Sequence, residues 1–382
     1  MRTITLLASA LLSSTASCGP AGGGGPRSDA GGDAPVIVDA SPDAVGADAG
    51  MNLVGGCSPA ALSACRYGPA APTRSSSRVV ELSYTDVTNA ARTIRVALHE
   101  PAGLTGPTPV VVWSHGGADG SMNAAASGAE WAEVFTAAGY LSMHIAHTGR
   151  TAAERSALCQ RLGYDAAACA TFKYLSWDRP HDVRRVLDWV EEQARGPMGA
   201  RIDVRRIAYA GHSAGAGAAL VVAGATRDIA GTQRALPDPR PVAFVSCSPQ
   251  GPDEEGFIEA SFGGVTRPHL TLSGVGDDTD GVPSESRRRP FELVGPGNKY
   301  RLWITEDSAR HTTFDFSTDA CVQFRMRAGQ DVARCRDYLP WLSSTMVAFL
   351  DANLRDSAAA RAWLASDNAA VLSGRVAEWS RR

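Results

Sequence analysis

The feature that most constrains the fold is an alternation of short, continuous apolar runs with segments of helical period. The apolar runs are typical of strands covered on both faces, and they lie at 109–113 (PVVVW), 141–145, 206–210, 242–247, 269–273 and 300–304. The helical segments lie at 129–138, after Pro180, at 214–225 and from about Leu339 onward. This alternation predicts an α/β fold with a mainly parallel central sheet flanked by helices on both faces.

Two segments depart from the alternation. Residues 78–84 and 93–99 are rich in β-formers and are joined by a polar turn with Asp86 and Asn89, which predicts an N-terminal antiparallel hairpin. Residues 148–177 fit neither period. We expect them to form a disulfide-containing insertion over the carboxyl edge of the sheet.

The sharpest local motif is GHSAG at 211–215, between the predicted strand 206–210 and the predicted helix from Ala214. A serine at such a strand-to-helix corner sits in a tight turn whose flanking glycines allow neighbouring backbone to approach closely. Its hydroxyl is then exposed at the end of the sheet. We therefore interpret Ser213 as a nucleophile.

A serine nucleophile needs a base, and the chain has eight histidines. In folds with this corner the order is serine, then acid, then histidine, which leaves His269 and His311 downstream of Ser213. His269 opens a predicted strand, and few acidic residues at a strand end precede it. His311 lies in a loop after the strand 300–304, so it is the expected base.

The acid that orients the histidine should follow a strand between Ser213 and His311. The strand 269–273 is such a strand, and it is followed by Asp277, Asp278 and Asp280. Any of the three could serve.

The oxyanion that forms during acyl transfer needs two N–H donors. One is expected from the backbone of Ala214. The other is expected from the loop after 109–113, where Gly117 is preferred and Gly116 is the alternative. His115 would fix this loop, and His212 would be the variable residue of the turn.

These motifs carry a family resemblance over residues 78–364. The chain resembles the α/β-hydrolases, and among them the dienelactone-hydrolase-like and platelet-activating-factor-acetylhydrolase-like esterases. The matching pieces are PVVVWSHGG at 109–117, RPHDV at 179–183, GHSAGAG at 211–217, SPQG at 248–251, SGVGD at 273–277, and His311 with Phe314.

The resemblance implies Asp277 as the acid, although related polyester hydrolases place it one residue later, at Asp278. Dienelactone hydrolases proper use a cysteine nucleophile, from which Ser213 departs. The resemblance therefore implies ester cleavage and not dienelactone chemistry.

The N-terminus predicts export. Residues 1–18 form a signal peptide pattern, and Cys18 ends a lipobox-like sequence in which Thr15 stands where leucine is usual. Residues 19–55 are dominated by Gly, Ala, Pro, Asp and Ser and predict a disordered tether, so the catalytic domain is expected at 56–382. We expect a periplasmic or cell-surface lipoprotein anchored at Cys18, with ordinary secretion as the alternative.

An oxidising compartment allows cysteines to pair. We expect Cys247 to be a buried free thiol. Three local disulfides are expected: Cys57 with Cys65, Cys159 with Cys169, and Cys321 with Cys335. No CxxC pair or histidine-rich spacing indicates a metal site, and no cofactor is expected.

The net charge of the chain limits the classes of binding partner that we expect. The formal net charge is −3, and the acidic excess lies in the predicted tether, so the folded part is close to neutral. A basic nucleic-acid surface is excluded, and no apolar run is long enough to span a bilayer. We expect a monomer that acts on small neutral esters and meets a membrane only through its N-terminal lipid.

The sequence thus predicts an exported serine carboxylic-ester hydrolase that works through an acyl-enzyme. The alternatives with the same three residues are a polyester depolymerase and a lipase or phospholipase-type acylhydrolase. A peptidase and a non-catalytic surface-binding lipoprotein are the more distant alternatives.

Overall fold

The computed structural model describes residues 56–69, 76–104, 106–117, 128–279, 282–315 and 332–382. The predicted signal peptide, its Cys18 and the predicted tether lie outside the described residues.

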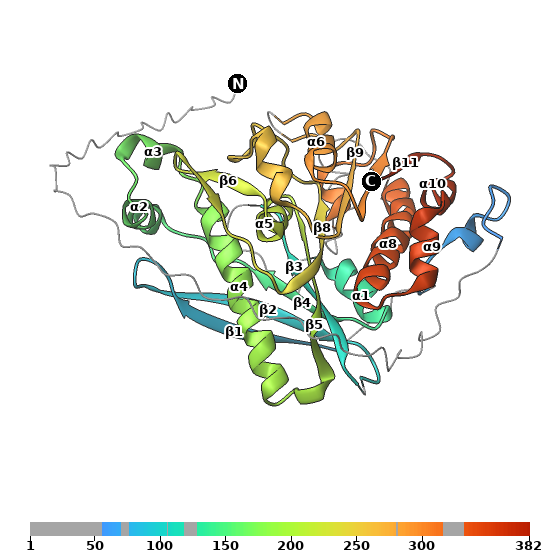
Figure 1. The fold of residues 1–382 in the computed structure, drawn as a ribbon, viewed down its shortest axis with the longest axis horizontal. Coiled ribbons are helices and arrows are strands. Elements are labelled where there is room, and N and C mark those ends of the chain that lie inside the picture. Colours follow the sequence, from blue (N-terminus) through green and yellow to red (C-terminus); the bar gives the residue numbers. More distant parts are fainter. Residues whose placement is uncertain (1–55, 70–75, 105, 118–127, 280–281, 316–331) are drawn as a thin grey trace, which may run out of the picture. The chain divides into compact units, whose positions relative to one another are not determined.

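The centre of the fold is a nine-stranded sheet in the order β1-β2-β4-β3-β5-β8-β9-β10-β11 (Figure 1). Its strands are β1 (Ser76–Thr85), β2 (Ala91–Glu100), β3 (Thr108–Ser114), β4 (Leu141–Ala146), β5 (Ile202–His212), β8 (Pro241–Cys247), β9 (His269–Gly274), β10 (Lys299–Ile304) and β11 (Ala377–Arg381). The strands from β4 through β10 in this order run parallel, whereas β1, β2 and β11 pair antiparallel with their neighbours. The expected α/β fold with a mainly parallel sheet is confirmed.

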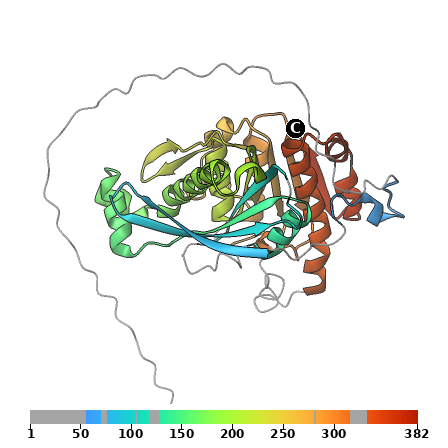
Figure 2. The same ribbon diagram turned by 90° about the horizontal axis from the view of Figure 1, so that it is seen from below.

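Helices cover both faces of this sheet, as Figures 1 and 2 show. One layer contains α4 (Tyr174–Arg195) and α5 (Ala214–Ala223). The other contains α1 (Ala129–Ala137), α8 (Val332–Leu354), α9 (Ala358–Ala365) and α10 (Asn368–Leu372).

The central residues of strand β3 are continuously apolar because both faces of the strand are covered. Val110 and Val112 pack into the core beneath α4 and α5, and Val111 and Trp113 pack into the core on the opposite face. Because successive side chains of a strand point to opposite faces, every residue of a strand that is covered on both sides faces a core, which favours apolar side chains at all of its central positions.

Several short elements complete the fold. A separate two-stranded hairpin is formed by β6 (Thr226–Ile229) and β7 (Thr232–Ala235). The remaining short helices are η1 (Leu62–Cys65), η2 (Gly199–Arg201), η3 (Glu259–Gly264), η4 (Ser284–Arg288), α6 (Arg289–Leu293) and η5 (His311–Phe314).

The segment that fits neither period contains two helices, α2 (Ala152–Arg161) and α3 (Ala166–Thr171). Thr151 caps α2 in a capping box with Glu154. Arg161 donates to the carbonyl of Val87 in the β1–β2 turn at 3.0 Å, so the segment packs beside that turn.

Helix α4 begins earlier than expected. The prediction placed Pro180 near its start, but the helix begins at Tyr174 and contains Pro180. A proline inside a helix removes one backbone hydrogen bond. Buried polar contacts of the neighbouring Asp178 and Arg179 hold the first turns in place despite this loss. Helix α8 likewise begins before the expected Leu339 and contains Pro340.

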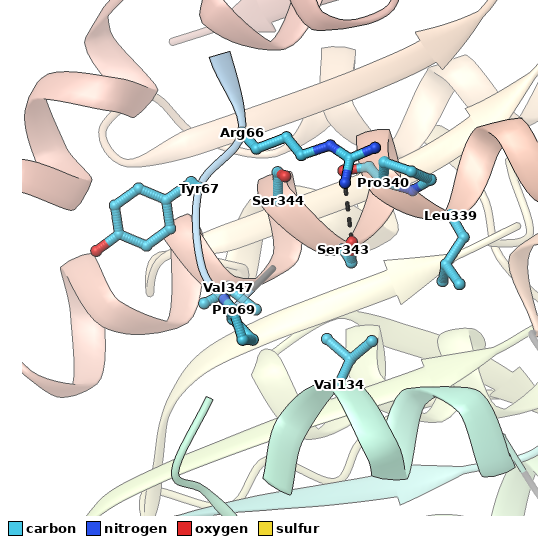
Figure 3. Close-up of a pocket in the computed structure, with 9 residues that line it drawn as sticks. All are labelled: Arg66, Tyr67, Pro69, Val134, Leu339, Pro340, Ser343, Ser344 and Val347. Atoms are coloured by element: carbon cyan, nitrogen blue, oxygen red, sulfur yellow. Dashed lines mark hydrogen bonds between the residues drawn. The ribbon is translucent and has the colours of Figure 1, made fainter. Parts of the chain in front are cut away.

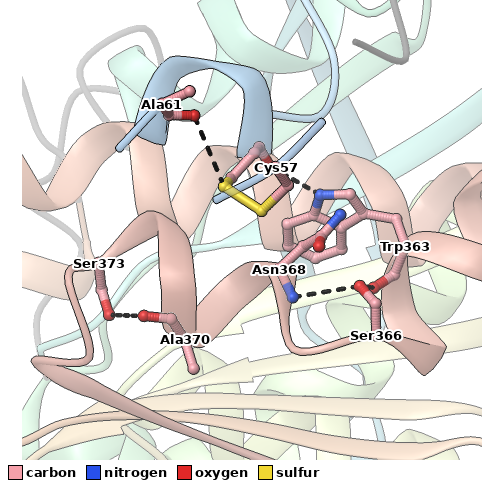
Figure 4. The surroundings of a disulfide bond; sticks show 8 residues. Cys57, Ala61, Trp363, Ser366, Asn368, Ala370 and Ser373 are labelled. Atoms are coloured by element: carbon pink, nitrogen blue, oxygen red, sulfur yellow. Dashed lines mark hydrogen bonds between the residues drawn. A yellow bond between two sulfur atoms is a disulfide. The ribbon is translucent and has the colours of Figure 1, made fainter. Parts of the chain in front are cut away.

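Two of the expected disulfides are present. Cys57 bonds Cys65, whose backbone carbonyl accepts a hydrogen bond from the indole of Trp363 at 2.8 Å (Figure 4). The Cys159–Cys169 bond joins α2 to α3.

Of the other cysteines, Cys247 is buried and free. The expected Cys321–Cys335 bond involves Cys321, which lies outside the described residues. Two disulfides indicate an oxidising environment outside the cytosol. None of the described helices has the length and apolar character that crossing a membrane requires.

Candidate active site

Ser213 occupies the corner between β5 and α5 with φ 52° and ψ −119°. A positive φ in a non-glycine residue is strained and persists only where surrounding contacts hold it. The N–H of Ser213 donates to the carbonyl of Cys247 on β8 at 2.9 Å. The corner is thus held by the neighbouring strand.

The two glycines of the motif are required by close packing. A Cβ on Gly215 would lie 2.2 Å from the carbonyl oxygen of Ser114, and one on Gly211 would lie 2.5 Å from the backbone of Gly215. Helix α5 therefore begins in direct contact with the end of β3.

His311 and Asp277 meet on the neighbouring loops. His311 begins η5, after β10, and Asp277 follows β9. The His311 Nδ1 donates to Asp277 Oδ1 at 2.7 Å. The other carboxylate oxygen accepts from Ser273 Oγ at 2.6 Å, and Arg287 Nε lies 3.2 Å from Oδ1.

The electrostatics favour an ionised Asp277. Complete burial alone would raise the pKa of this carboxyl, but the charge and hydrogen bond of His311 and the charge of Arg287 outweigh it, so the pKa is lowered. An ionised carboxylate on Nδ1 fixes the imidazole tautomer and leaves Nε2 to exchange protons.

The structure separates the three aspartates that followed the same strand. Asp277 is fully buried against His311, whereas Asp278 is exposed and accepts the N–H of Ser284 at 2.7 Å. Asp280 lies outside the described residues.

His311 is brought next to the corner by its backbone. Its carbonyl accepts hydrogen bonds from His212 Nε2 at 2.8 Å and from Ser248 Oγ at 3.2 Å. The His311 and His212 rings lie 4.7 Å apart. No direct hydrogen bond between the Ser213 and His311 side chains is present among the described residues.

The predicted oxyanion donors also lie at this corner. Ala214 is the first residue of α5, and the first amides of a helix have no partner within it. Gly117 has φ 74° in the loop after β3. A Cβ on the adjacent Gly116 would lie 3.0 Å from the Cβ of Ser213, so this loop packs against the serine.

His212, treated in the sequence as the variable residue of the turn, has a defined role in positioning His311. Because a carbonyl only accepts, its bond to His311 makes Nε2 the protonated nitrogen, and Nδ1 is left as an acceptor. Nδ1 faces Asp315 Oδ1 at 3.6 Å, and neither atom has a hydrogen-bond partner among the described residues. Burial raises the pKa of Asp315 to about 7.

A second Ser-His-Asp chain lies beneath the loop after β3. His147 Nε2 lies 2.9 Å from Ser114 Oγ, and its Nδ1 lies 2.8 Å from Asp182. Arg92 pairs with Asp182 at 2.7 Å. All three of these side chains are buried, and together they hold the end of β3 in place.

Three residues beside this site had no role predicted from the sequence in positioning it: Arg179, His212 and Asp315. Arg179 and Asp182 stood in the RPHDV motif without an assigned role, and Asp315 directly follows Phe314. The signal that could have identified them is their position within or directly beside the motifs that carry the family resemblance.

The described residues hold no cluster of three or more His, Cys, Asp or Glu that could bind a metal ion. One cavity, of about 80 Å³, lies between α1, α8 and the segment Arg66–Pro69 (Figure 3). Another, of about 240 Å³, lies between the end of β1 and α4. Neither is lined by Ser213, Asp277 or His311.

No protein-family model matches the chain, and a comparison with curated proteins finds none that is significantly similar.

Proposed function

We propose that this chain is a serine hydrolase of the α/β-hydrolase fold that cleaves carboxylic esters. The observation that carries the proposal is the convergence of a strained serine corner with a partly exposed His311 that is bonded at 2.7 Å to the buried carboxylate of Asp277. The order serine, acid, histidine along the chain and the antiparallel β1–β2 pair before the parallel strands support the fold assignment.

In the proposed mechanism, Ser213 Oγ attacks the ester carbonyl while His311 Nε2 takes the hydroxyl proton. Asp277 stabilises the imidazolium that forms. The alkoxide of the substrate leaves with that proton, and an acyl-enzyme on Ser213 remains. Water then attacks the acyl group with His311 again acting as base, which releases the acid and restores the serine.

The N–H groups of Ala214 and Gly117 are the proposed donors to the oxyanion. Each such donor contributes roughly 10²–10³-fold to kcat in acyl transfer. Their value comes from being held in place before the substrate arrives, because no reorganisation is then needed during the reaction.

The proposed setting is outside the cytosol, because two disulfides accompany the N-terminal signal and lipobox-like patterns. We propose a monomer anchored through lipidated Cys18, with small neutral esters as substrates. The near-neutral charge of the folded part supports neutral substrates.

The test is Ser213→Ala, with Ser343→Ala as the matched control, since Ser343 lies on α8 and its hydroxyl donates to the carbonyl of Pro340. We expect Ser213→Ala to abolish hydrolysis of short-chain p-nitrophenyl esters and labelling by a fluorophosphonate probe. The control should retain both. Labelling that persists at another residue in Ser213→Ala contradicts the proposal.

The same assay separates substrate classes. Hydrolysis of soluble short-chain esters without release of acid from polyester films or long-chain lipid emulsions supports an esterase. Turnover of films or emulsions in preference to soluble esters instead identifies the polyester depolymerase or the lipase.

A further inference from the structure

Arg179 of α4 is a buried cation whose polar contacts go to the loop beside Ser213. The residue is 1 % exposed. The two terminal nitrogens donate to backbone carbonyls of that loop, Nη1 to His115 and Nη2 to Gly117, the latter at 2.7 Å. Its Nε has no partner among the described residues.

Among the described residues, this arginine lacks the usual compensation for a buried charge. No carboxylate of the described residues forms an ion pair with Arg179, and burial lowers its pKa to about 10, so it stays charged at neutral pH. Burying an unpaired cation is costly, and an apolar side chain of similar size could fill the same space without that cost. An apolar side chain could not make the hydrogen bonds of Arg179 to the loop carbonyls, so these bonds are what the buried charge contributes.

The loop has a third anchored carbonyl. His115 Nδ1 contacts the carbonyl oxygen of Gly116, and since a carbonyl only accepts, Nδ1 carries the proton. His115 Nε2 accepts the backbone N–H of His147 at 3.2 Å, which agrees with this tautomer. Burial and the charge of Arg179 hold the pKa of His115 well below its usual range, so the ring stays neutral.

Three successive carbonyls of residues 115–117 are therefore held. Each peptide unit is planar and trans, so the N–H lies opposite the carbonyl of the preceding residue. The N–H of Gly116 must point away from Arg179, and the N–H of Gly117 must point away from the His115 ring. Gly116 packs directly against Ser213, which places these amides beside the nucleophile.

We propose that Arg179 is a positioning residue. By holding the carbonyls of His115 and Gly117 on either side of the Gly116–Gly117 peptide, it fixes the loop that presents the Gly117 N–H to the oxyanion and thereby sets the rate of acyl transfer. This inference rests on the proposed esterase function. A planar guanidinium spans two carbonyls at once, which a lysine ammonium on a flexible stem does not reproduce.

The test compares Arg179→Met and Arg179→Lys with Arg267→Lys. Arg267 is the matched control because its hydrogen bonds among the described residues also go to backbone carbonyls, those of Asp238, Pro241 and Val222, at the opposite end of the sheet. Methionine removes the buried charge at similar size, so we expect that variant to fold.

We expect Arg179→Met to lower kcat by roughly 10²-fold and Arg179→Lys by about 10-fold, with KM changed by less than about threefold. Affinity for a phenylboronic acid should fall in parallel, because its tetrahedral adduct on the serine places an oxygen where the oxyanion forms. Arg267→Lys should keep the wild-type kcat.

The outcomes of this test distinguish the positioning role of Arg179 from the proposed esterase function. A folded Arg179→Met with wild-type kcat and boronic acid affinity overturns the role of Arg179 while the esterase assignment stands. A rise in KM alone also overturns it. A wild-type protein that neither hydrolyses esters nor labels at Ser213 overturns both.

Discussion

At the scale of residues, the choice among three neighbouring aspartates decides how His311 works. Asp277 is buried and bonds the imidazole, whereas Asp278 is exposed and bonds only a loop amide. Two adjacent aspartates therefore differ in role: Asp277 sets the tautomer of the imidazole, and Asp278 stabilises a turn.

Asp277→Asn should reduce kcat by roughly 10³–10⁴-fold, because an amide can hold the imidazole in the wrong tautomer. The matched control is Asp278→Asn, whose amide oxygen can still accept the N–H of Ser284, and it should stay within about twofold of wild type. Steady-state kinetics on a short-chain ester measures both. Equal losses in the two variants would contradict the assignment of the acid.

The raised pKa of Asp315 leads to a second prediction, which concerns how the free energy of unfolding depends on pH. Burial raises its pKa to about 7, with Arg179 pulling the other way, and the neutral ring of His212 faces it. The folded protein keeps this proton between about pH 4 and 7 while the unfolded chain loses it. The free energy of unfolding therefore falls as pH rises through that window and is constant above it, a loss of roughly 4 kcal/mol at most.

Asp315→Asn should remove this loss. Urea unfolding at pH 5 and pH 8 should show the variant gaining stability relative to wild type at the higher pH. A stability difference that is the same at both values would mean that Asp315 is ionised in the folded protein throughout.

At the scale of elements, the contact between α5 and β3 holds the serine corner. Gly215 lies so close to Ser114 that any side chain must push the helix off the strand. The same contact sets the distance between Ser213 and the loop of residues 115–117.

Gly215→Ala should lower the free energy of unfolding by about 2 kcal/mol or more, the range seen when side chains are forced into packed interiors. The control is Gly263→Ala in η3, where a Cβ meets nothing within 4 Å. Chemical denaturation of both variants tests this. A stable Gly215→Ala with full turnover would show that the corner can relax.

Elements were predictable where the local pattern was strong. Strand β3 has a continuous apolar run and helix α5 a run of small and apolar residues, so both elements were predictable from their local sequence. The start of α4 was not predictable, because Pro180 disfavours a helix interior and only long-range contacts of Asp178 and Arg179 offset it. Hairpin β6–β7 and strand β11 also lack a strong alternation and form through tertiary pairing.

At the scale of the whole folded unit, the parallel strands bring distant loops to one edge. Ser213 follows β5, Asp277 follows β9 and His311 follows β10, and the carboxyl ends of parallel strands lie together. The order of the strands in the sheet therefore brings together loops that lie far apart in the sequence, which no local motif could do. It brings three residues spread over about a quarter of the chain to one edge of the sheet.

The sequence by itself determined the alternation of strands and helices, the serine corner and the order of candidate residues, because these depend on covalent neighbours and local periodicity. Only the tertiary structure decided that Asp277 contacts His311, that His212 and Asp315 stand behind it, and that Arg179 holds the loop beside Ser213. These contacts join residues far apart in the chain. Their geometry is set by how helices pack on the sheet, which no local pattern encodes.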